Sequence, residues 1–178
     1  MRSKFPDMSV EELTAIYHYT TDAYYDLNRA LRGLDPMTDQ LDAFNKALSK
    51  SMDKLPKYTN TTYRGSHVPE SVLNNYKNAF DNKTKVIEDA FTSTSKESNV
   101  AVSFADDVIK DGDVRVFFTI EGKNGVDIED ISAYGPSFDP SYSESEILFK
   151  SGLEFKVSNF EDTFDGSGNR LVLITLTE

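Results

Sequence analysis

The stretch Ser141-Tyr-Ser-Glu144-Ser-Glu146-Ile-Leu-Phe149 places two carboxylates, two residues apart, at the head of an apolar run. Alternate side chains of a β-strand share a face, so a strand here would put Glu144, Glu146 and Leu148 on one side. Like charges at that spacing repel, and one glutamate is therefore expected to have a raised pKa. Taken alone, such a pair is more often the solvated end of a strand than a functional site. The rest of the chain is needed to choose between these two interpretations.

The residues after this pair have the pattern of a β-hairpin. Lys150-Ser-Gly152 has the composition of a tight turn, and the apolar residues from Leu153 to Val157 alternate with charged ones. Alternation of this kind is typical of a half-buried strand. The pattern predicts that both glutamates sit on rigid backbone at the mouth of the hairpin.

Composition sets limits on the fold and on the partners. The 178 residues, 38% hydrophobic and 12% aromatic, are enough for one domain with a sizeable core. The formal charge of −11 disfavours a nucleic-acid partner and suits a cationic one, such as an arginine side chain of another protein. The chain has no cysteine, which excludes disulfides and thiolate zinc sites.

The N-terminus carries Arg2 and Lys4, but no apolar segment of a signal peptide follows them. No stretch approaches the roughly 20 apolar residues of a membrane span. We therefore expect neither a Sec signal nor a membrane partner, and export by another route or as one piece of a longer polypeptide.

The first third of the chain, about 9–56, has helical periodicity. Ser9 and Glu12 have the spacing of a capping box. Thr20-Thr-Asp22 interrupts the apolar stripe, and further helices are predicted over about 23–32 and 37–55.

From residue 61 the pattern changes to strands. The expected strands and helices are 61–65 extended, 72–80 helical, 86–95 extended, 98–105 helical, 114–120 and 126–128 extended, a loop over 133–143, and a last hairpin turning at 165–168. With no linker and no repeat, we predict one α+β domain over 1–178, with a sheet core over about 61–178 and mainly antiparallel strands.

Several common sites are absent from the sequence. It has neither G-x-G-x-x-G nor a P-loop, and His18 and His67 lack the spacing of metal ligands. The acidic stretch 106–113 lacks the spacing of an EF-hand, so no metal site is expected.

Two polar motifs remain. Arg64 follows an aromatic residue, ends a predicted strand and precedes Gly65, a place where a guanidinium can bind a diphosphate and backbone can approach it closely. The alternative is a surface salt bridge. The run Phe91-Thr-Ser93-Thr-Ser95 offers hydroxyls that could orient a carboxylate, or it is an ordinary strand end before a helix cap at Ser98.

Together these motifs resemble the mono-ADP-ribosyltransferase toxins of the Arg-Ser-Glu type. The likeness is to actin-modifying clostridial binary toxins and Rho-modifying exoenzymes. It rests on Arg64, on F-x-S-T-S around Ser93, on E-x-E at Glu144 and Glu146, and on a helical pattern; that pattern comprises Tyr19, Tyr24, Asn28, Leu31 and Arg32. The resemblance covers about residue 9 to the C-terminus and implies N-terminal helices packed on two mainly antiparallel sheets around an NAD cleft.

The resemblance also implies roles for single residues. Arg64, with Gly65, would hold the NAD diphosphate, and Tyr24 and Asn28, with Tyr19, would line the adenosine side. Ser93 would direct the catalytic Glu146 by a hydrogen bond, and Phe104 would lie against nicotinamide. Glu144 would face the acceptor, with Phe138 or Tyr142 of the loop 133–143 reading the target. Some relatives have a second arginine a few residues after the aromatic residue that corresponds to Phe104. In this chain Asp106 and Asp107 occupy that place, so how the second NAD phosphate is held stays open.

The implied activity is transfer of ADP-ribose from NAD, as a substrate, to an arginine side chain, with release of nicotinamide. In such enzymes, Glu at the first E-x-E position accompanies arginine acceptors. Glu144 occupies that position here, so the resemblance implies an arginine acceptor. The implied protein is a monomeric bacterial or phage toxin, secreted or injected, that acts in a target-cell cytoplasm. Actin, a small GTPase or a bacterial protein would each fit as target. An NAD glycohydrolase and a non-catalytic NAD-binding relative are the alternatives.

Overall fold

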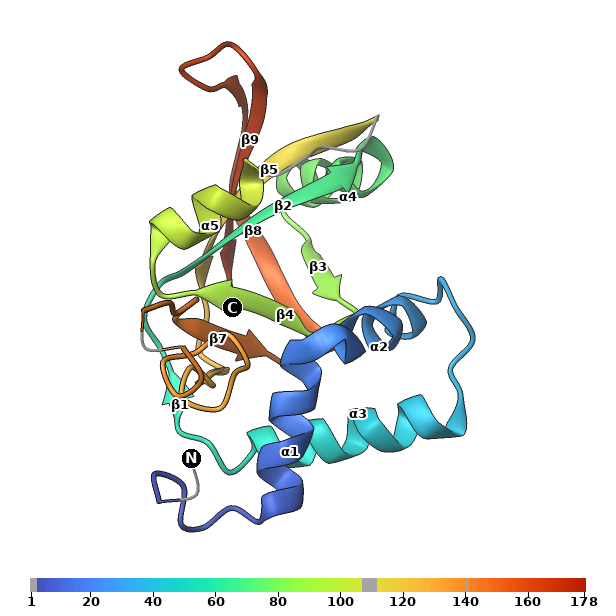
Figure 1. The fold of residues 1–178 in the computed structure, drawn as a ribbon. Helices are drawn as coiled ribbons and strands as arrows, with labels where there is room; N and C mark the ends of the chain where they lie inside the picture. Colours follow the sequence, from blue (N-terminus) through green and yellow to red (C-terminus); the bar gives the residue numbers. More distant parts are fainter. Residues whose placement is uncertain (1–2, 107–111, 140) are drawn as a thin grey trace. The chain divides into compact units, whose positions relative to one another are not determined.

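The computed structural model describes residues 3–106, 112–139 and 141–178. The chain is α+β and divides into two compact units, each built from segments far apart in the sequence (Figure 1). The first unit comprises Met1–Tyr58, Asp89–Thr92 and Asn124–Gly152, and the second comprises Thr59–Glu88, Ser93–Lys123 and Leu153–Glu178.

The helices of the first unit follow the predicted pattern. Helix α1, Val10–His18, begins with the predicted capping box, in which Ser9 Oγ accepts from Glu12 N and the Glu12 carboxylate accepts from Ser9 N. A single π-helical turn, Tyr19–Ala23, interrupts the helix where a break was predicted, and α2 continues over Tyr24–Leu31. Helix α3, Asp39–Met52, begins two residues later than predicted because the Thr38 side chain caps Leu41 N.

The core of the first unit lies among these helices and three short antiparallel strands. Strand β6, Gly125–Asp127, pairs with β1, Lys57–Tyr58, on one side and with β7, Glu146–Phe149, on the other. All four side chains of β7 are buried. The cluster of buried residues is Met8, Leu13, Ile16, Tyr19, Leu27, Leu48, Met52, Leu55, Phe91, Val126, Ile128, Ile131 and Leu148.

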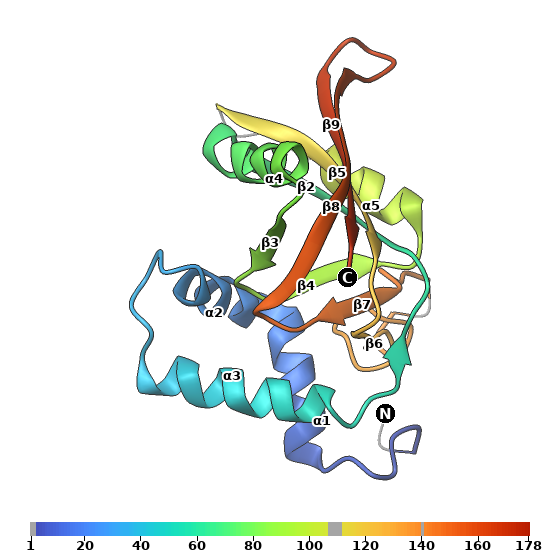
Figure 2. The ribbon, with the colours of Figure 1, turned by 180° about the vertical axis from the view of Figure 1, so that it is seen from behind.

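The second unit contains six strands of the sheet, in the order β4-β2-β5-β9-β8-β3 (Figure 2). Neighbouring strands are antiparallel, as predicted, except for the parallel pair β5 and β9. The strands are β2, Thr62–Pro69; β3, Lys85–Glu88; β4, Thr92–Ser95; β5, Asp113–Glu121; β8, Leu153–Phe164; and β9, Arg170–Thr177.

Two helices cover opposite faces of this sheet. Helix α5, Ser98–Ala105, lies on the face to which His67 points, because the His67 imidazole is 2.9 Å from the Ala105 carbonyl oxygen. Helix α4, Glu70–Asn82, lies on the other face, where Tyr76 contacts Phe118 with ring centroids 5.3 Å apart. Phe118 is opposite Arg64 in the ladder, so even-numbered residues of β2 face α4 and odd-numbered residues face α5.

The predicted hairpin after the two glutamates is wrong. Strand β7 pairs with β6, whereas β8 pairs with β3 and β9, so the turn at Gly152 joins strands that have different partners. Glu144 also lies outside β7, because Ser145 has a φ of +48° and ends the extended backbone. The two glutamates therefore do not share a face through strand alternation.

Two other predicted strands differ in extent. Strand β2 runs on to Pro69, since β5 pairs with it along its whole length, and Arg64 is therefore inside the strand and not at its end. The extended stretch 86–95 is two strands separated by the segment Asp89–Phe91. Helix α5, strand β5 and the last hairpin through Asp165–Gly168 are confirmed. Within the described residues, no helix has the length and apolar character needed to cross a membrane.

Candidate active site

Glu146 is a buried carboxylate with a defined hydrogen-bond partner. It is the first residue of β7, and its side chain is 6% exposed. The hydroxyl of Ser132, itself fully buried, donates to Glu146 Oε2 over 2.9 Å. Ser132 Oγ in turn accepts from Tyr134 N at 3.2 Å, which fixes the direction of its own proton toward the carboxylate. The Glu146 backbone is held as well, since its carbonyl accepts from Ile128 N.

Glu144 is held differently. Its backbone N–H donates to the Tyr134 carbonyl over 3.0 Å, and its half-buried carboxylate accepts from the Tyr142 hydroxyl at 3.3 Å. Burial raises the pKa of the Glu144 carboxyl, although the hydrogen bond from Tyr142 opposes the shift. The prediction that one glutamate has a raised pKa is confirmed for Glu144, with burial and not repulsion from its neighbour as the main cause.

The loop 133–143 is anchored at its base to the π-helical turn. Ala133 N donates to Thr20 Oγ1 over 2.9 Å, and Thr20 Oγ1 donates to the Tyr17 carbonyl. The Tyr17 ring also contacts the ring of Phe138, with centroids 4.9 Å apart. Phe138 and Tyr142, predicted to read the target, are 49% and 48% exposed. The loop therefore has a fixed base and accessible aromatic side chains.

The predicted adenosine-side residues fall into two groups. Tyr19 and Asn28 are buried, and both bind the backbone of Phe91. The Asn28 amide does so in both directions, accepting from Phe91 N at 3.2 Å and donating to Phe91 O at 3.4 Å. Tyr24 is 47% exposed and meets Tyr19 edge to face. Tyr19 and Asn28 thus position the segment before β4, and contact of these three residues with NAD stays a prediction.

In the second unit, Arg64 and Ser93 lie together. Strand β2 pairs with β4, and the Arg64 guanidinium donates from Nη1 to the Ser93 carbonyl oxygen over 2.7 Å. The structure therefore brings two of the predicted catalytic residues into direct contact, through the backbone of Ser93 and not its hydroxyl. The expected hydrogen bond from the Ser93 hydroxyl to Glu146 stays a prediction.

The packing of α5 explains why residue 65 is a glycine, a reason that the sequence did not indicate. A Cβ at this position would lie 1.9 Å from the Ala101 carbonyl oxygen and 2.5 Å from Ala105 N, both in α5. The missing side chain therefore lets α5 pack on β2, whereas close approach to a ligand was the predicted reason. Phe104 of the same helix is 46% exposed, and its contact with nicotinamide stays a prediction.

Comparison with known proteins decides the family. The family model described as ADP-ribosyltransferase exoenzyme matches residues 3–177. The chain belongs to the ADP-ribosyltransferase exoenzyme family. The NAD(+)--protein-arginine ADP-ribosyltransferase Tre1 of Serratia proteamaculans is 33% identical over 150 residues, which are 84% of this chain and 29% of Tre1. Secreted exoenzyme S of Pseudomonas aeruginosa is 28% identical over 152 residues, 82% of this chain and 28% of that protein.

The fold agrees with this assignment. The crystal structure of ADP-ribosyltransferase Vis in complex with the M6 inhibitor superposes with a TM-score of 0.73 and 25% identity, over 98% of this chain and 76% of Vis. The predicted family resemblance and the α+β class are therefore confirmed. The chain spans under a third of the length of Tre1 and of exoenzyme S.

Three residues of this family member were missed by sequence reasoning. Ser132 binds Glu146, Thr20 anchors the loop, and Glu129 binds the serines on either side of Glu144. Each lies outside the recognised motifs, and serine, threonine and glutamate are too common for one of them to stand out. The apolar residues Val126, Ile128 and Ile131, with acidic residues between them, end directly before a Gly- and Pro-rich loop. This was the one available signal, since polar groups at the base of a loop need partners.

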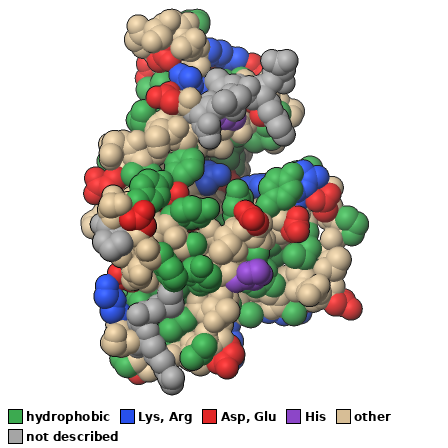
Figure 3. Space-filling view, viewed as in Figure 1, with side chains coloured by type: hydrophobic (Ala, Val, Ile, Leu, Met, Phe, Trp, Pro, Cys, Tyr) green, Lys and Arg blue, Asp and Glu red, His purple; other side chains and the backbone are tan. Residues whose placement is uncertain are grey.

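Charged side chains of both signs lie on the described part of the surface. On the described part of the face in Figure 3, lysine and arginine side chains lie in small separate groups among acidic and apolar ones. Among the described residues, no three His, Asp or Glu side chains gather closely enough to hold a metal ion. The acidic stretch 106–113 lies largely outside the described residues.

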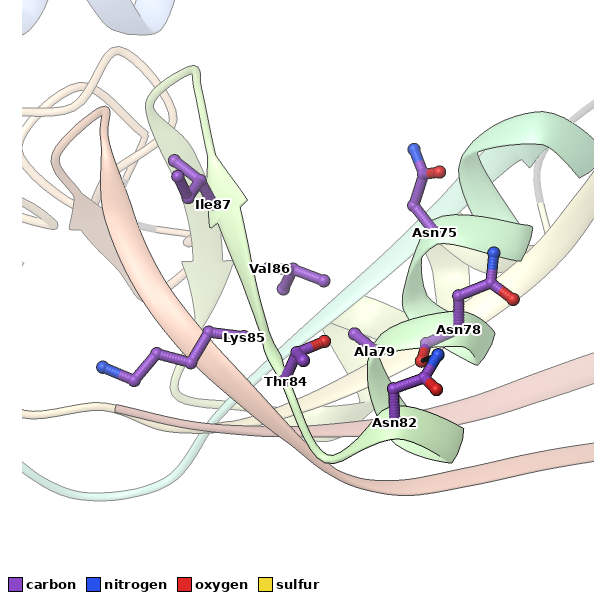
Figure 4. Close-up of a pocket in the computed structure, with 8 residues that line it drawn as sticks. All are labelled: Asn75, Asn78, Ala79, Asn82, Thr84, Lys85, Val86 and Ile87. Carbon is purple, nitrogen blue, oxygen red and sulfur yellow. Dashed lines mark hydrogen bonds between the residues drawn. The ribbon is translucent and has the colours of Figure 1, made fainter.

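A pocket of about 430 Å³ opens between α4 and β3 in the second unit (Figure 4). Asn75, Asn78 and Asn82 of α4 line it on one side, and Val86 and Ile87 of β3 line it on the other. Lys85, its cationic lining residue, is paired with Glu154 over 2.9 Å. None of the predicted site residues lines this pocket, and we assign no chemistry to it.

Proposed function

We propose that this chain is the catalytic domain of an NAD-dependent protein-arginine mono-ADP-ribosyltransferase. The family match over residues 3–177 carries the proposal, together with a pair of glutamates held in two distinct ways at one end of β7. The names of relatives such as Tre1 support arginine as the acceptor. We further propose that residues 1–178 act as one catalytic domain, without a metal cofactor, and that NAD is a substrate.

Glu146 is proposed as the catalytic glutamate. The bond between the ribose carbon and the nicotinamide nitrogen breaks with its electron pair leaving on nicotinamide, and positive charge develops on the ribose, as in glycoside cleavage. A buried carboxylate next to that carbon stabilises the charge. Ser132 keeps one carboxylate oxygen in place, so that little reorganisation is needed during the reaction.

Glu144 is proposed to serve the acceptor. A protonated guanidinium is a poor nucleophile, and a carboxylate beside it binds the cation and accepts its proton as the new carbon–nitrogen bond forms. Its raised pKa makes Glu144 a stronger base than an ordinary surface glutamate. Phe138 and Tyr142, exposed beside it, are proposed to contact the target protein.

The remaining site residues are proposed to hold NAD. Arg64, with Gly65, binds the diphosphate, because its guanidinium makes one hydrogen bond among the described residues, to Ser93, and keeps further N–H donors. Tyr19, Tyr24 and Asn28 form the adenosine side. Ser93 is proposed to direct Glu146 by a hydrogen bond, and Phe104 is proposed to contact nicotinamide.

Relatives named as a toxin and as a secreted exoenzyme support export of the protein. We propose that it is secreted or injected and acts as a monomer in the cytoplasm of a target cell. Its acceptor is an accessible arginine on a protein of that cell.

The test measures both outcomes of NAD cleavage. Purified chain is incubated with labelled NAD and a cell lysate, nicotinamide release is followed by chromatography, and protein adducts are identified by mass spectrometry. Glu146→Gln should abolish release and adducts together. Glu144→Gln should lose adducts while retaining much of the nicotinamide release. Glu161→Gln, an exposed position on β8, is the matched control and should match the wild type.

The outcomes separate the competing functions. Nicotinamide release with free ADP-ribose and no adduct would indicate a glycohydrolase. Binding of NAD in calorimetry without any release would indicate a non-catalytic relative. Equal residual transfer in Glu144→Gln and Glu146→Gln would contradict the two roles.

A further inference from the structure

The backbone that carries Glu144 has an unusual conformation on its C-terminal side. Ser145 has a φ of +48°, in the left-handed region that residues other than glycine rarely adopt. A residue held there costs free energy, and it persists only where its surroundings fix it. The segment Ser143–Ser145, which presents Glu144, therefore needs partners that hold it in place.

Glu129 supplies those partners. Its Oε1 accepts from the Ser143 hydroxyl over 2.5 Å and from the Ser145 hydroxyl over 3.3 Å. The Ser145 N–H donates to Ser143 Oγ over 3.0 Å and closes the arrangement. One carboxylate oxygen thus binds both neighbours of Glu144 and leaves the Glu144 side chain itself to other groups.

Glu129 is itself fixed from two directions. Its N–H donates to Asp127 Oδ1 over 3.1 Å, directly after strand β6. Its carbonyl oxygen lies against Gly135, where an added Cβ would be only 1.7 Å away. Because the first residues of the loop are packed onto Glu129, its carboxylate has a firm base from which to hold the two serines.

We infer that Glu129 is a positioning residue of the acceptor-side carboxylate, Glu144. The inference rests on the proposed function, in which Glu144 takes the proton of the acceptor arginine. Hydrogen bonds to a charged carboxylate are about twice as strong as neutral ones, and they hold Ser143 and Ser145 in the conformation that presents Glu144. Loss of this hold lets the Glu144 side chain move away from the acceptor while Ser132 continues to hold Glu146.

The predicted consequence is a change in the ratio of transfer to arginine over hydrolysis of NAD. Cleavage of NAD needs Glu146, whereas capture of the ribosyl group by arginine also needs Glu144 at the right place. A displacement of Glu144 therefore reduces transfer by more than it reduces hydrolysis. A residue with a merely structural role would reduce both reactions in parallel.

The experiment compares four proteins: wild type, Glu129→Ala, Glu129→Gln and Ser143→Ala. Each is incubated with NAD and free arginine, and total nicotinamide and ADP-ribosyl-arginine are measured in the same reaction. Glu129→Ala should lower the ratio of transfer to hydrolysis roughly tenfold, the loss expected for a charge-assisted hydrogen bond. Glu129→Gln keeps an acceptor oxygen and should lower the ratio roughly threefold. Ser143→Ala removes one donor, leaves Glu129 intact, and should also lower the ratio.

Three outcomes are decisive. A graded fall in the ratio, in the order Ala below Gln below wild type, supports the inference. An active wild type with unchanged ratios in Glu129→Ala and Ser143→Ala overturns the inference and leaves the proposed function standing. A wild type that cleaves no NAD overturns the proposed function, and the inference with it.

Discussion

Replacement of Ser132 by alanine tests the most direct link between fold and chemistry. The change removes one hydroxyl from a fully buried site and leaves Glu146 Oε2 without the donor at 2.9 Å. A hydrogen bond to a charged group contributes about 1.5–3 kcal/mol. If the bond is fully made in the transition state, a loss of that size lowers the rate roughly 10- to 100-fold, since about 1.4 kcal/mol corresponds to a factor of ten.

Two readouts distinguish positioning from simple loss of stability. The Ser132 hydroxyl holds one oxygen of the Glu146 carboxylate, so Ser132→Ala should lower nicotinamide release and arginine transfer by a similar factor. The value of kcat should fall more than KM rises, because the contact that is lost is to the proposed catalytic carboxylate of Glu146. Initial rates of nicotinamide release and of ADP-ribosyl-arginine formation over a range of NAD concentrations supply both quantities.

The matched control is Ser167→Ala, at the exposed tip of the β8–β9 turn. It should keep the wild-type rates of both reactions, and circular dichroism melts should show that both variants are folded at the assay temperature. The reasoning is refuted if Ser132→Ala is folded and cleaves NAD at the wild-type rate. It is also refuted if the variant loses transfer alone, because Glu146 is proposed to act in both reactions.

Four further predictions concern Glu144, Gly65 and Asn28. Because burial raises the pKa of Glu144, arginine transfer by the wild type should fall on acidification at a higher pH than an ordinary glutamate would give, whereas the pH profile of nicotinamide release, which Glu144→Gln retains, should lack this limb. The raised pKa of Glu144 also predicts a pH dependence of stability. Its contribution to the free energy of unfolding is present below its unfolded pKa and is lost as the pH rises through its folded pKa. Glu144→Gln should therefore weaken the decline of the free energy of unfolding with pH, measured by urea titrations. Gly65→Ala should destabilise the fold by about 2–4 kcal/mol in denaturant titrations, since its Cβ meets the α5 backbone, whereas Gly166→Ala, with open space around it, should be close to neutral; equal midpoints would contradict the packing argument. Asn28→Ala removes the side-chain acceptor of the Phe91 N–H and leaves the Phe91 carbonyl with the Tyr19 hydroxyl alone; it should cost about 2–3 kcal/mol in the same assay, and a variant as stable as wild type would show that the Asn28 contact is dispensable.

Local signals in the sequence were sufficient for most helices. The capping box at Ser9 and Glu12 is a short-range arrangement, since both partners lie within one turn. Helix α5 was predicted with its observed bounds because its polar start and its apolar residues all lie within eight consecutive residues. Elements of this kind depend little on the rest of the chain.

Strand pairing was less predictable, because it is decided by residues far apart in the sequence. The alternation over Leu153–Val157 correctly indicated a strand, but its partners are β3 and β9 and not the adjacent β7. Strand β7 is buried on both faces, so its four residues show no alternation that could reveal a neighbour. A turn such as the one at Gly152 shows only that the chain changes direction.

The candidate site was predictable where chemistry is concentrated in a motif, and unpredictable where it is supplied by ordinary residues. Arg64, Ser93, Glu144 and Glu146 carry recognisable spacing, and the structure brings Arg64 into contact with Ser93. Ser132 reaches Glu146 from 14 positions earlier in the chain and carries no such signal. The feature that reveals it is burial of a hydroxyl beside a carboxylate, which only the folded chain shows.

The two-residue spacing of the glutamates acquires a different meaning from these contacts. A continuous strand would place both carboxylates in one environment, exposed or buried together. The left-handed Ser145 separates them instead: Glu146 enters β7 and is held by Ser132, while Glu144 stays on the loop between two serines bound by Glu129. Two adjacent carboxylates with different tasks need different surroundings, since identical ones would give them the same pKa and the same mobility. The break in the strand is therefore the structural condition for assigning bond cleavage to one glutamate and the acceptor to the other.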